Sequence, residues 1–178
     1  MSQGFSELSS LRREVEIGVS GLEFQEMQEY ISKLQKASGL IKIREEDIQP
    51  SPALRVGRIF YHGIPRQKEA EAFAEVVRIA GEATSGKEEP DAEVKIFTTP
   101  GCRYCPRAVL AAAKLVAAGA GIELHIYDAL EFRELAEEYG VTSVPKIVVK
   151  DRVFIEAQTT EGKYKGLLLK ALEQLNVK

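Results

Sequence analysis

The chain has 178 residues, of which 44% are apolar, and a formal net charge of −3 at pH 7. This length allows one domain or two small ones with a sizeable core, and the interspersed charges, without a basic run of five residues, argue against a nucleic-acid partner. No apolar segment of about 18 residues occurs and the N-terminus has no signal-peptide core, so we expect no membrane partner and a cytoplasmic location. The 29% of charged residues, with a single asparagine and no tryptophan, leans towards a thermophile.

The first half begins with a polar lead-in over residues 1–13. After it, apolar residues alternate with polar ones where we expect strands, and recur every three or four residues where we expect helices. The expected elements, in chain order, are a strand at 15–19, a helix at 24–34, strands at 40–43, 51–56 and 58–61, and a helix at 66–80.

Residues 81–91 have no apolar periodicity, so we expect the boundary between two units there. We expect a first unit over residues 14–85, a linker over 86–91 and a second unit over 92–178. The second unit should contain a strand at 94–97, a helix at 103–118, a strand at 122–126, a helix at 131–139, strands at 147–149 and 153–155, and a helix at 161–175.

The two halves are similar to each other. Residues 15–17 align with 94–96 at an offset of 79, whereas residues 58–60 align with 152–154 at an offset of 94. The increase in the offset matches the length of the helix at 131–139 with its connecting loops, which the first half lacks. We therefore expect one face of the sheet in the first half to be less covered. At the offset of 79 the positions of the two cysteines are occupied by Glu23 and Glu26, which cannot exchange disulfides.

Cys102 and Cys105 are the only cysteines, and they stand three positions apart where a strand should turn into a helix. Unpaired backbone N–H groups and the helix dipole stabilise an anion at such a turn, which lowers the pKa of a thiol from ~8.5 into the range ~3.5 to 7.5. Arg103 and Arg107 act in the same direction, and Pro106 is tolerated in the first turn of a helix.

Three other interpretations of the pair remain open. A disulfide across so short a loop stabilises a fold by only about 2 kcal/mol. A zinc site needs about four ligands, and the only histidines, His62 and His125, do not lie at ligand spacing from the pair. The thiols can also be packed core residues. A Cys-x-x-Cys beside a strand and a helix nevertheless favours redox chemistry. Cys105 should point inward, because it shares a helix face with Val109 and Ala112.

The motifs around this pair resemble a known family. The run from Phe97 to Pro106, followed by Val141-Thr142-Ser143-Val144-Pro145, resembles the glutaredoxin-type active site and the cis-proline loop of a thioredoxin-fold unit. Over residues 14–178 the tandem arrangement is similar to the protein disulfide oxidoreductases of thermophiles, which commonly carry a Cys-x-x-Cys in each half. The cysteine-free first half is similar to the N-terminal tandem domain of the flavoprotein subunit of alkyl hydroperoxide reductase.

This resemblance implies an α/β fold of two tandem thioredoxin-like units, each with a mixed sheet flanked by helices. It implies a cis peptide bond at Val144-Pro145, with the Val144 backbone open to an extended substrate, and Pro52 is expected to repeat the cis turn. Tyr104 and Arg103, beside the first sulfur, are the further candidate substrate contacts.

We therefore expect a thiol-disulfide oxidoreductase that acts on protein disulfides. Cys102, nearer the surface, attacks as a thiolate and Cys105 resolves the mixed disulfide. No organic cofactor is required, and the resemblance supplies a flavoprotein thioredoxin reductase or a peroxiredoxin as the redox partner. The alternative is a non-catalytic scaffold that binds a metal or an iron-sulfur cluster through the same cysteines.

Overall fold

The computed structural model describes residues 3–83 and 89–177. After the N-terminal lead-in, which forms two short helices, the elements of the first half follow the expected order, with bounds that differ by a few residues at most. The elements of this half are α1 (Gln3–Ser6), the 3-10 helix η1 (Glu7–Ser10), β1 (Val15–Ser20), α2 (Gln25–Ala37), β2 (Ile41–Glu45), β3 (Ala53–Val56), β4 (Ile59–His62) and α3 (Gln67–Glu82).

The second half repeats this order and adds the expected helix between its second and third strands. Its elements are β5 (Ala92–Thr98), α4 (Cys105–Ala117), β6 (Ile122–Asp128), α5 (Arg133–Glu138), β7 (Lys146–Val149), β8 (Val153–Glu156) and α6 (Glu161–Gln174). Residues 86–88 of the expected linker lie outside the described residues.

All eight strands form one sheet, in the order β2-β1-β3-β4-β6-β5-β7-β8. Each half has the same internal order of its four strands, which confirms the repeat. Each half contributes a mixed set of four strands, as expected, and β4 pairs in parallel with β6, with Tyr61 opposite Ile126, which joins the two sets into one sheet. Exposed strand edges tend to pair, and this pairing removes one edge from each half.

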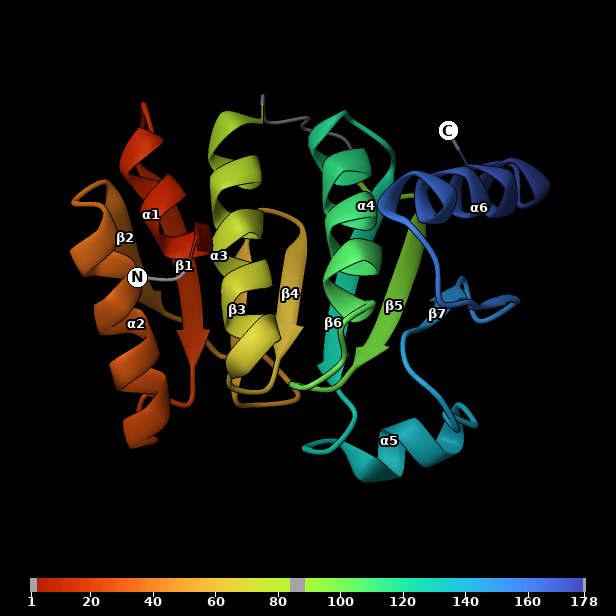
Figure 1. The fold of residues 1–178 in the computed structure, drawn as a ribbon, viewed down its shortest axis with the longest axis horizontal. Helices are drawn as coiled ribbons and strands as arrows, with labels where there is room; N and C mark the ends of the chain where they lie inside the picture. Colours follow the sequence, from red (N-terminus) through yellow and green to blue (C-terminus); the bar gives the residue numbers. More distant parts are fainter. Residues whose placement is uncertain (1–2, 84–88, 178) are drawn as a thin grey trace.

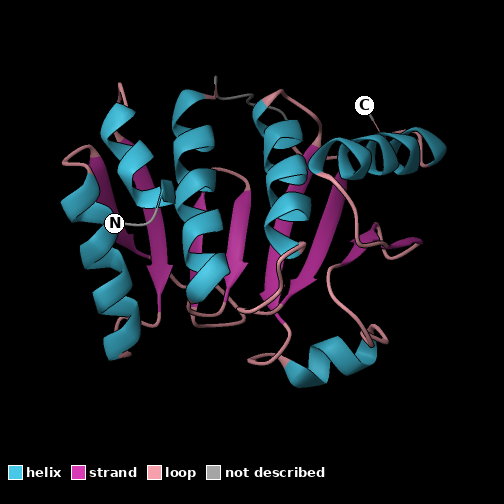
Figure 2. Ribbon diagram, in the orientation of Figure 1, coloured by secondary structure: helices cyan, strands magenta, loops and turns pink. Residues whose placement is uncertain are grey.

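Most helices cover one face of the sheet. Figure 1 and Figure 2 show α1, α2, α3 and α4 side by side in front of the strands, with α6 lying crosswise next to α4 at the upper right. The main core lies between these helices and the sheet, and its buried side chains come from both halves, among them Ile17, Phe73, Ile126 and Leu168. Burial of apolar surface stabilises a fold by roughly 25 cal/mol per Å², so the shared core holds the halves together.

The opposite face is covered by α5 in the second half only, where Ala136 packs with Phe97, Tyr127 and Val148. Among the described residues of the first half, no helix takes the corresponding place, as expected. Its bare face is not a continuous apolar patch, because exposed charged side chains such as Glu16, Lys42 and Arg44 point outward from β1 and β2. Arg55 of β3 binds the carboxylate of Glu46 there, at 2.8 Å from Nε to Oε2.

The N-terminal lead-in is more than a polar extension. Leu8 is fully buried in the main core and Leu11 is 7% exposed. The chain passes close to α3 at this point, since a Cβ added to Gly81 would lie 2.9 Å from the Leu11 side chain. Isolated apolar residues within a polar run have no periodicity, which is why the packing was not visible in the sequence.

Candidate active site

The two cysteines lie between the end of β5 at Thr98 and the start of α4 at Cys105. They form a disulfide, with their Cα atoms 5.5 Å apart. Cys102 is partly exposed, whereas Cys105 is 1% exposed. Cys105 lies on the helix face of Val109 and Ala112, both buried in the core. The inward direction expected for Cys105 is therefore confirmed.

The helix start provides the electrostatic setting that the sequence indicates. The backbone N–H of Cys105 donates to Cys102 Sγ, at 3.1 Å. Pro106 occupies the first turn of α4, and that turn holds no acidic residue. An N–H group directed at the sulfur and the positive end of the helix dipole both favour a thiolate at Cys102 once the disulfide is reduced.

Arg103, Tyr104 and Arg107 form a small cluster on the surface beside Cys102. The guanidinium of Arg103 donates from Nη2 to the Tyr104 hydroxyl, at 3.2 Å. The two guanidinium carbons lie 5.1 Å (Arg103) and 5.2 Å (Arg107) from the centre of the Tyr104 ring. The hydrogen bond from Arg103 is the main reason that the pKa of Tyr104 is lowered. Cations thus hold this ring at the edge of the site.

The loop before β7 closes the other side of the disulfide. The Val144-Pro145 peptide bond is cis, as the resemblance implied, and so is Ser51-Pro52; a third cis bond, Gln49-Pro50, was not expected. The Val144 carbonyl oxygen lies 3.8 Å from Cys102 Sγ. Val144 also lines a groove of about 350 Å³ together with Thr99, Leu130, Arg133, Val141 and Ser143, among others.

Glu69 is a buried acid near the pair that is not among the site residues expected from the sequence. It comes from α3 in the first half and is 4% exposed. The Thr98 hydroxyl donates a hydrogen bond to Glu69 Oε1, while Oε2 has no hydrogen-bond partner among the described residues. Burial raises the pKa of Glu69 to about 7, and the bond from Thr98 opposes this shift. The carboxyl therefore changes charge near neutral pH.

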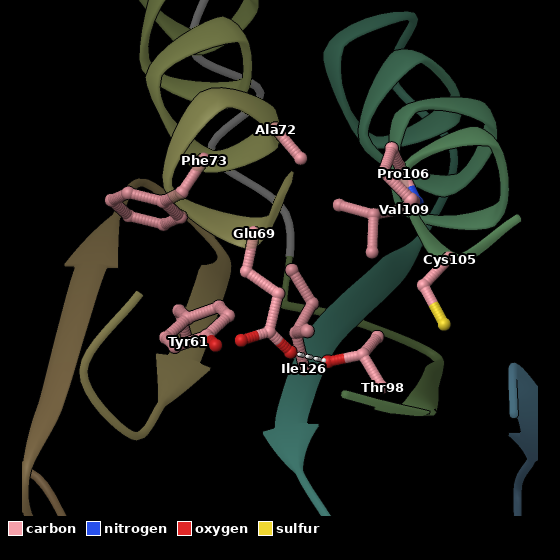
Figure 3. Close-up of a pocket in the computed structure, with 9 residues that line it drawn as sticks. All are labelled: Tyr61, Glu69, Ala72, Phe73, Thr98, Cys105, Pro106, Val109 and Ile126. Carbon is pink, nitrogen blue, oxygen red and sulfur yellow. Dashed lines mark hydrogen bonds between the residues drawn. The ribbon is translucent and has the colours of Figure 1, made fainter. Parts of the chain in front are cut away.

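A cavity of about 10 Å³ lies between Glu69 and Cys105. Its walls include Glu69, Tyr61, Thr98 and Cys105, and Figure 3 shows these side chains arranged around it between α3 and α4. This volume is close to the lower limit for one water molecule. The sequence did contain a signal for Glu69, because it falls on the apolar face of its helix, four residues before Phe73.

The first half also contacts the cysteine loop directly, since the backbone N–H of Lys68 donates to the Pro100 carbonyl at 3.3 Å. Glu23 and Glu26, at the positions that correspond to the cysteines, are exposed. Glu26 pairs with Arg66, at 2.6 Å from Oε2 to Nη2. These residues are not part of the candidate site.

His62 and His125 do not join the cysteines. They lie on the opposite face of the sheet from α4, on β4 and β6, and their rings contact each other. Burial lowers the pKa of His62 to about 4. With the thiols in a disulfide and both histidines elsewhere, the metal or iron-sulfur scaffold is not favoured.

Comparison with known proteins gives matches to the second half and to the whole chain. The thioredoxin domain family profile matches residues 92–168. A "probable thioredoxin" of the archaeon Methanothermobacter thermautotrophicus is 32% identical over 76 residues, which cover 42% of this chain and 89% of that protein. Among the described residues, no helix is long and apolar enough to cross a membrane.

Two solved structures resemble the entire tandem fold. The NTD_N/C domain of alkylhydroperoxide reductase AhpF from Enterococcus faecalis superimposes with a TM-score of 0.78 at 19% identity, covering 93% of this chain and 96% of that one. A protein disulfide oxidoreductase from Aeropyrum pernix superimposes with a TM-score of 0.73 at 23% identity, covering 96% and 91%. Both share the tandem arrangement of this chain.

Proposed function

Because this chain belongs to the thioredoxin family, we propose that it exchanges disulfides with protein substrates through Cys102 and Cys105. The observation that carries the proposal is the different placement of the two sulfurs. Cys102 is partly exposed at the start of a helix, and Cys105 is buried one turn inward. An exposed attacking thiolate and a protected resolving thiol are what a two-step exchange requires.

The reaction begins with the reduced protein. The Cys102 thiolate attacks one sulfur of a substrate disulfide, the substrate S–S bond breaks, and one substrate thiolate leaves. Cys105 then loses its proton and attacks Cys102 Sγ, which forms the intramolecular disulfide and releases the second substrate thiolate. The protein gives up two electrons and the substrate gains them, so no organic cofactor is needed.

Glu69 is our candidate acceptor for the Cys105 proton. The carboxyl and the sulfur line the same cavity, and a pKa of about 7 lets the group take up a proton and release it near neutral pH. A water molecule in the cavity can carry the proton between them. Thr98 positions the carboxyl by its hydrogen bond to Oε1.

The groove beside Val144 is our candidate docking site for the substrate. Its position next to Cys102 Sγ suits an extended peptide that pairs with the Val144 backbone beside the buried Pro145 ring. Arg103 and Tyr104 stand at the edge of the sulfur, where they can contact the peptide on the other side. As redox partner we propose a flavoprotein thioredoxin reductase or a peroxiredoxin, in line with the AhpF fold.

Thiol counting tests the proposal. Fully reduced protein, freed of reductant, is mixed with a substrate protein that contains one accessible disulfide. We expect two thiols to disappear from this chain for every disulfide that the substrate loses. An unchanged thiol count after prolonged mixing would contradict the proposed activity.

The glutaredoxin-like type is a further prediction. It requires that the dithiol equilibrates with glutathione. Titration of the Cys102–Cys105 couple in glutathione buffers measures this exchange and gives the reduction potential, which decides between oxidase and reductase roles. Failure to reach equilibrium with glutathione, while dithiothreitol still reduces the disulfide, would argue against the glutaredoxin-like type.

A further inference from the structure

A second cluster of reactive side chains lies far from the thiols, where the two halves join. Glu93 of β5 and Glu123 and His125 of β6 place one ligand atom each within 4.8 Å of one another. Behind them, His62 of β4 contacts the His125 ring. The chemistry of this cluster is independent of the proposed disulfide exchange.

The two histidines form a chain of three contacts with an acceptor at each end. His62 Nδ1 lies 2.9 Å from the Pro50 carbonyl oxygen, His62 Nε2 lies 2.9 Å from His125 Nδ1, and His125 Nε2 lies 2.7 Å from Glu123 Oε1. A neutral imidazole carries one N–H group, so two of them supply two protons for three contacts. The third contact must hold an additional proton or a cation.

The contact with Glu123 is the one that a cation can reach. His62 is fully buried, and the His125 side chain is 12% exposed, whereas those of Glu123 and Glu93 are 33% and 41% exposed. If the proton of His125 is on Nδ1 and is donated to His62, its Nε2 lone pair faces two carboxylates.

The local charge also favours a cation. Lys95 Nζ binds Glu93 Oε1 and Asp151 Oδ1, which leaves the other oxygen of Glu93 for a second partner. The second oxygen of Glu93, Oε2, is left directed at His125, at 3.7 Å from Nε2. Two carboxylates, Glu93 and Glu123, therefore face the same imidazole nitrogen, an arrangement that attracts a cation.

We propose that His125 Nε2, Glu123 and Glu93 bind one divalent transition-metal ion, with Zn²⁺ as the best match. An imidazole nitrogen with two carboxylates suits zinc, whereas Ca²⁺ and Mg²⁺ prefer oxygen ligands alone. Ligand atoms about 2.1 Å from a tetrahedral zinc are about 3.4 Å apart. The Glu93 oxygen is near that separation, and the partly exposed Glu123 must turn outward by about 0.7 Å. Water completes the fourth position.

His62 and the Pro50 carbonyl are the outer shell of this site. A metal-binding histidine donates its other N–H to a fixed acceptor, which sets the tautomer and the ring orientation. Here that acceptor is the His62 imidazole on β4, so a bound metal ties β4 to β5 and β6 and stabilises the join between the two halves. Binding to the folded state alone raises the unfolding temperature.

The experiment uses the full chain in its oxidised form, so that the disulfide keeps both thiols from binding metal. Chelator-treated protein is titrated with ZnCl2 by calorimetry and with CoCl2 by visible absorption. We expect one ion per chain, a d–d spectrum of tetrahedral Co²⁺ and a higher unfolding temperature. Glu123→Gln should weaken binding by at least about 10-fold, and His62→Gln by about 10- to 100-fold.

Glu16→Gln is the matched control, because Glu16 points to the same side of the sheet on β1, pairs with Arg44 and is not in the cluster. It should leave metal affinity unchanged. Absence of zinc binding by the wild-type chain would overturn the proposal and leave an imidazolium as the third contact. Binding that Glu123→Gln and His125→Gln both leave intact would overturn it too, because the ion then sits elsewhere.

Discussion

Glu69 of α3 accepts a hydrogen bond from Thr98, the last residue of the strand that leads into the cysteine pair. The bond is buried and joins the two halves of the chain. A residue of the cysteine-free half thus completes the surroundings of Cys105. We infer that this half supports the redox site from within the same core.

We predict that stability falls as the pH rises through neutrality. Burial raises the pKa of Glu69 from its ordinary 4.5 to about 7, so its contribution is fully present below pH 4.5 and is lost as the pH passes about 7. The loss amounts to at most about 3 kcal/mol. Urea unfolding of the oxidised protein between pH 5 and 8 measures it.

Glu69→Gln should flatten this profile, because the amide does not ionise. Glu71→Gln, on the same helix but exposed, should leave it as in the wild type. An identical pH dependence in the Glu69→Gln variant would mean that another group is responsible.

Glu69→Gln should also slow the attack of Cys105 on the mixed disulfide, and it should leave the first attack by Cys102 unchanged. Without a proton acceptor near Cys105, resolution of the mixed disulfide should be about 100-fold slower, while alkylation of Cys102 should proceed as before. In the wild type the resolution rate should rise as Glu69 ionises near pH 7. Rapid-quench measurement of the mixed disulfide separates the two steps, and an equal loss in both would argue against a role for Glu69 in proton transfer.

Removing the positive charges beside Cys102 should make its thiolate less populated. The double variant Arg103→Ala and Arg107→Ala is expected to lower the rate of iodoacetamide labelling at mildly acidic pH by roughly two- to fivefold, since exposed charges contribute little each. Arg152→Ala, in the exposed turn between β7 and β8, serves as the control. If Cys102 is labelled as fast in the double variant as in the wild type, the start of helix α4 alone accounts for its reactivity.

The second half alone, residues 92–178, should not form a stable monomer. Without the first half, the edge of β6 that pairs with β4 is exposed, and so is the side of α4 that packs on α3. The fragment also lacks Glu69. Circular dichroism and gel filtration of the fragment test this. A monomeric fragment with full activity on both a small disulfide and a protein disulfide would show that the first half has no part in folding or docking.

The elements from β1 to α6 were predictable, because each has a local pattern, whereas α1 and η1 have none. Helix α4 begins at Cys105 and not at 103, next to Pro106 in its first turn. What could not be predicted depends on distant pairing. The join of β4 with β6 brings His62 to His125, and the packing of α3 beside α4 brings Glu69 to the wall of the Cys105 cavity. No local signal encodes a partner 63 residues away.

The central claim is that Cys102 attacks and Cys105 resolves, and trapping of the mixed disulfide tests it most directly. Cys105→Ser and Cys102→Ser variants are reduced, mixed with a protein that contains one disulfide, quenched with acid and analysed by mass spectrometry. We predict a covalent complex through Cys102 with the Cys105→Ser variant, and none with Cys102→Ser. A complex that accumulates only with Cys102→Ser would reverse the roles, and a complex with neither variant would contradict the proposed exchange.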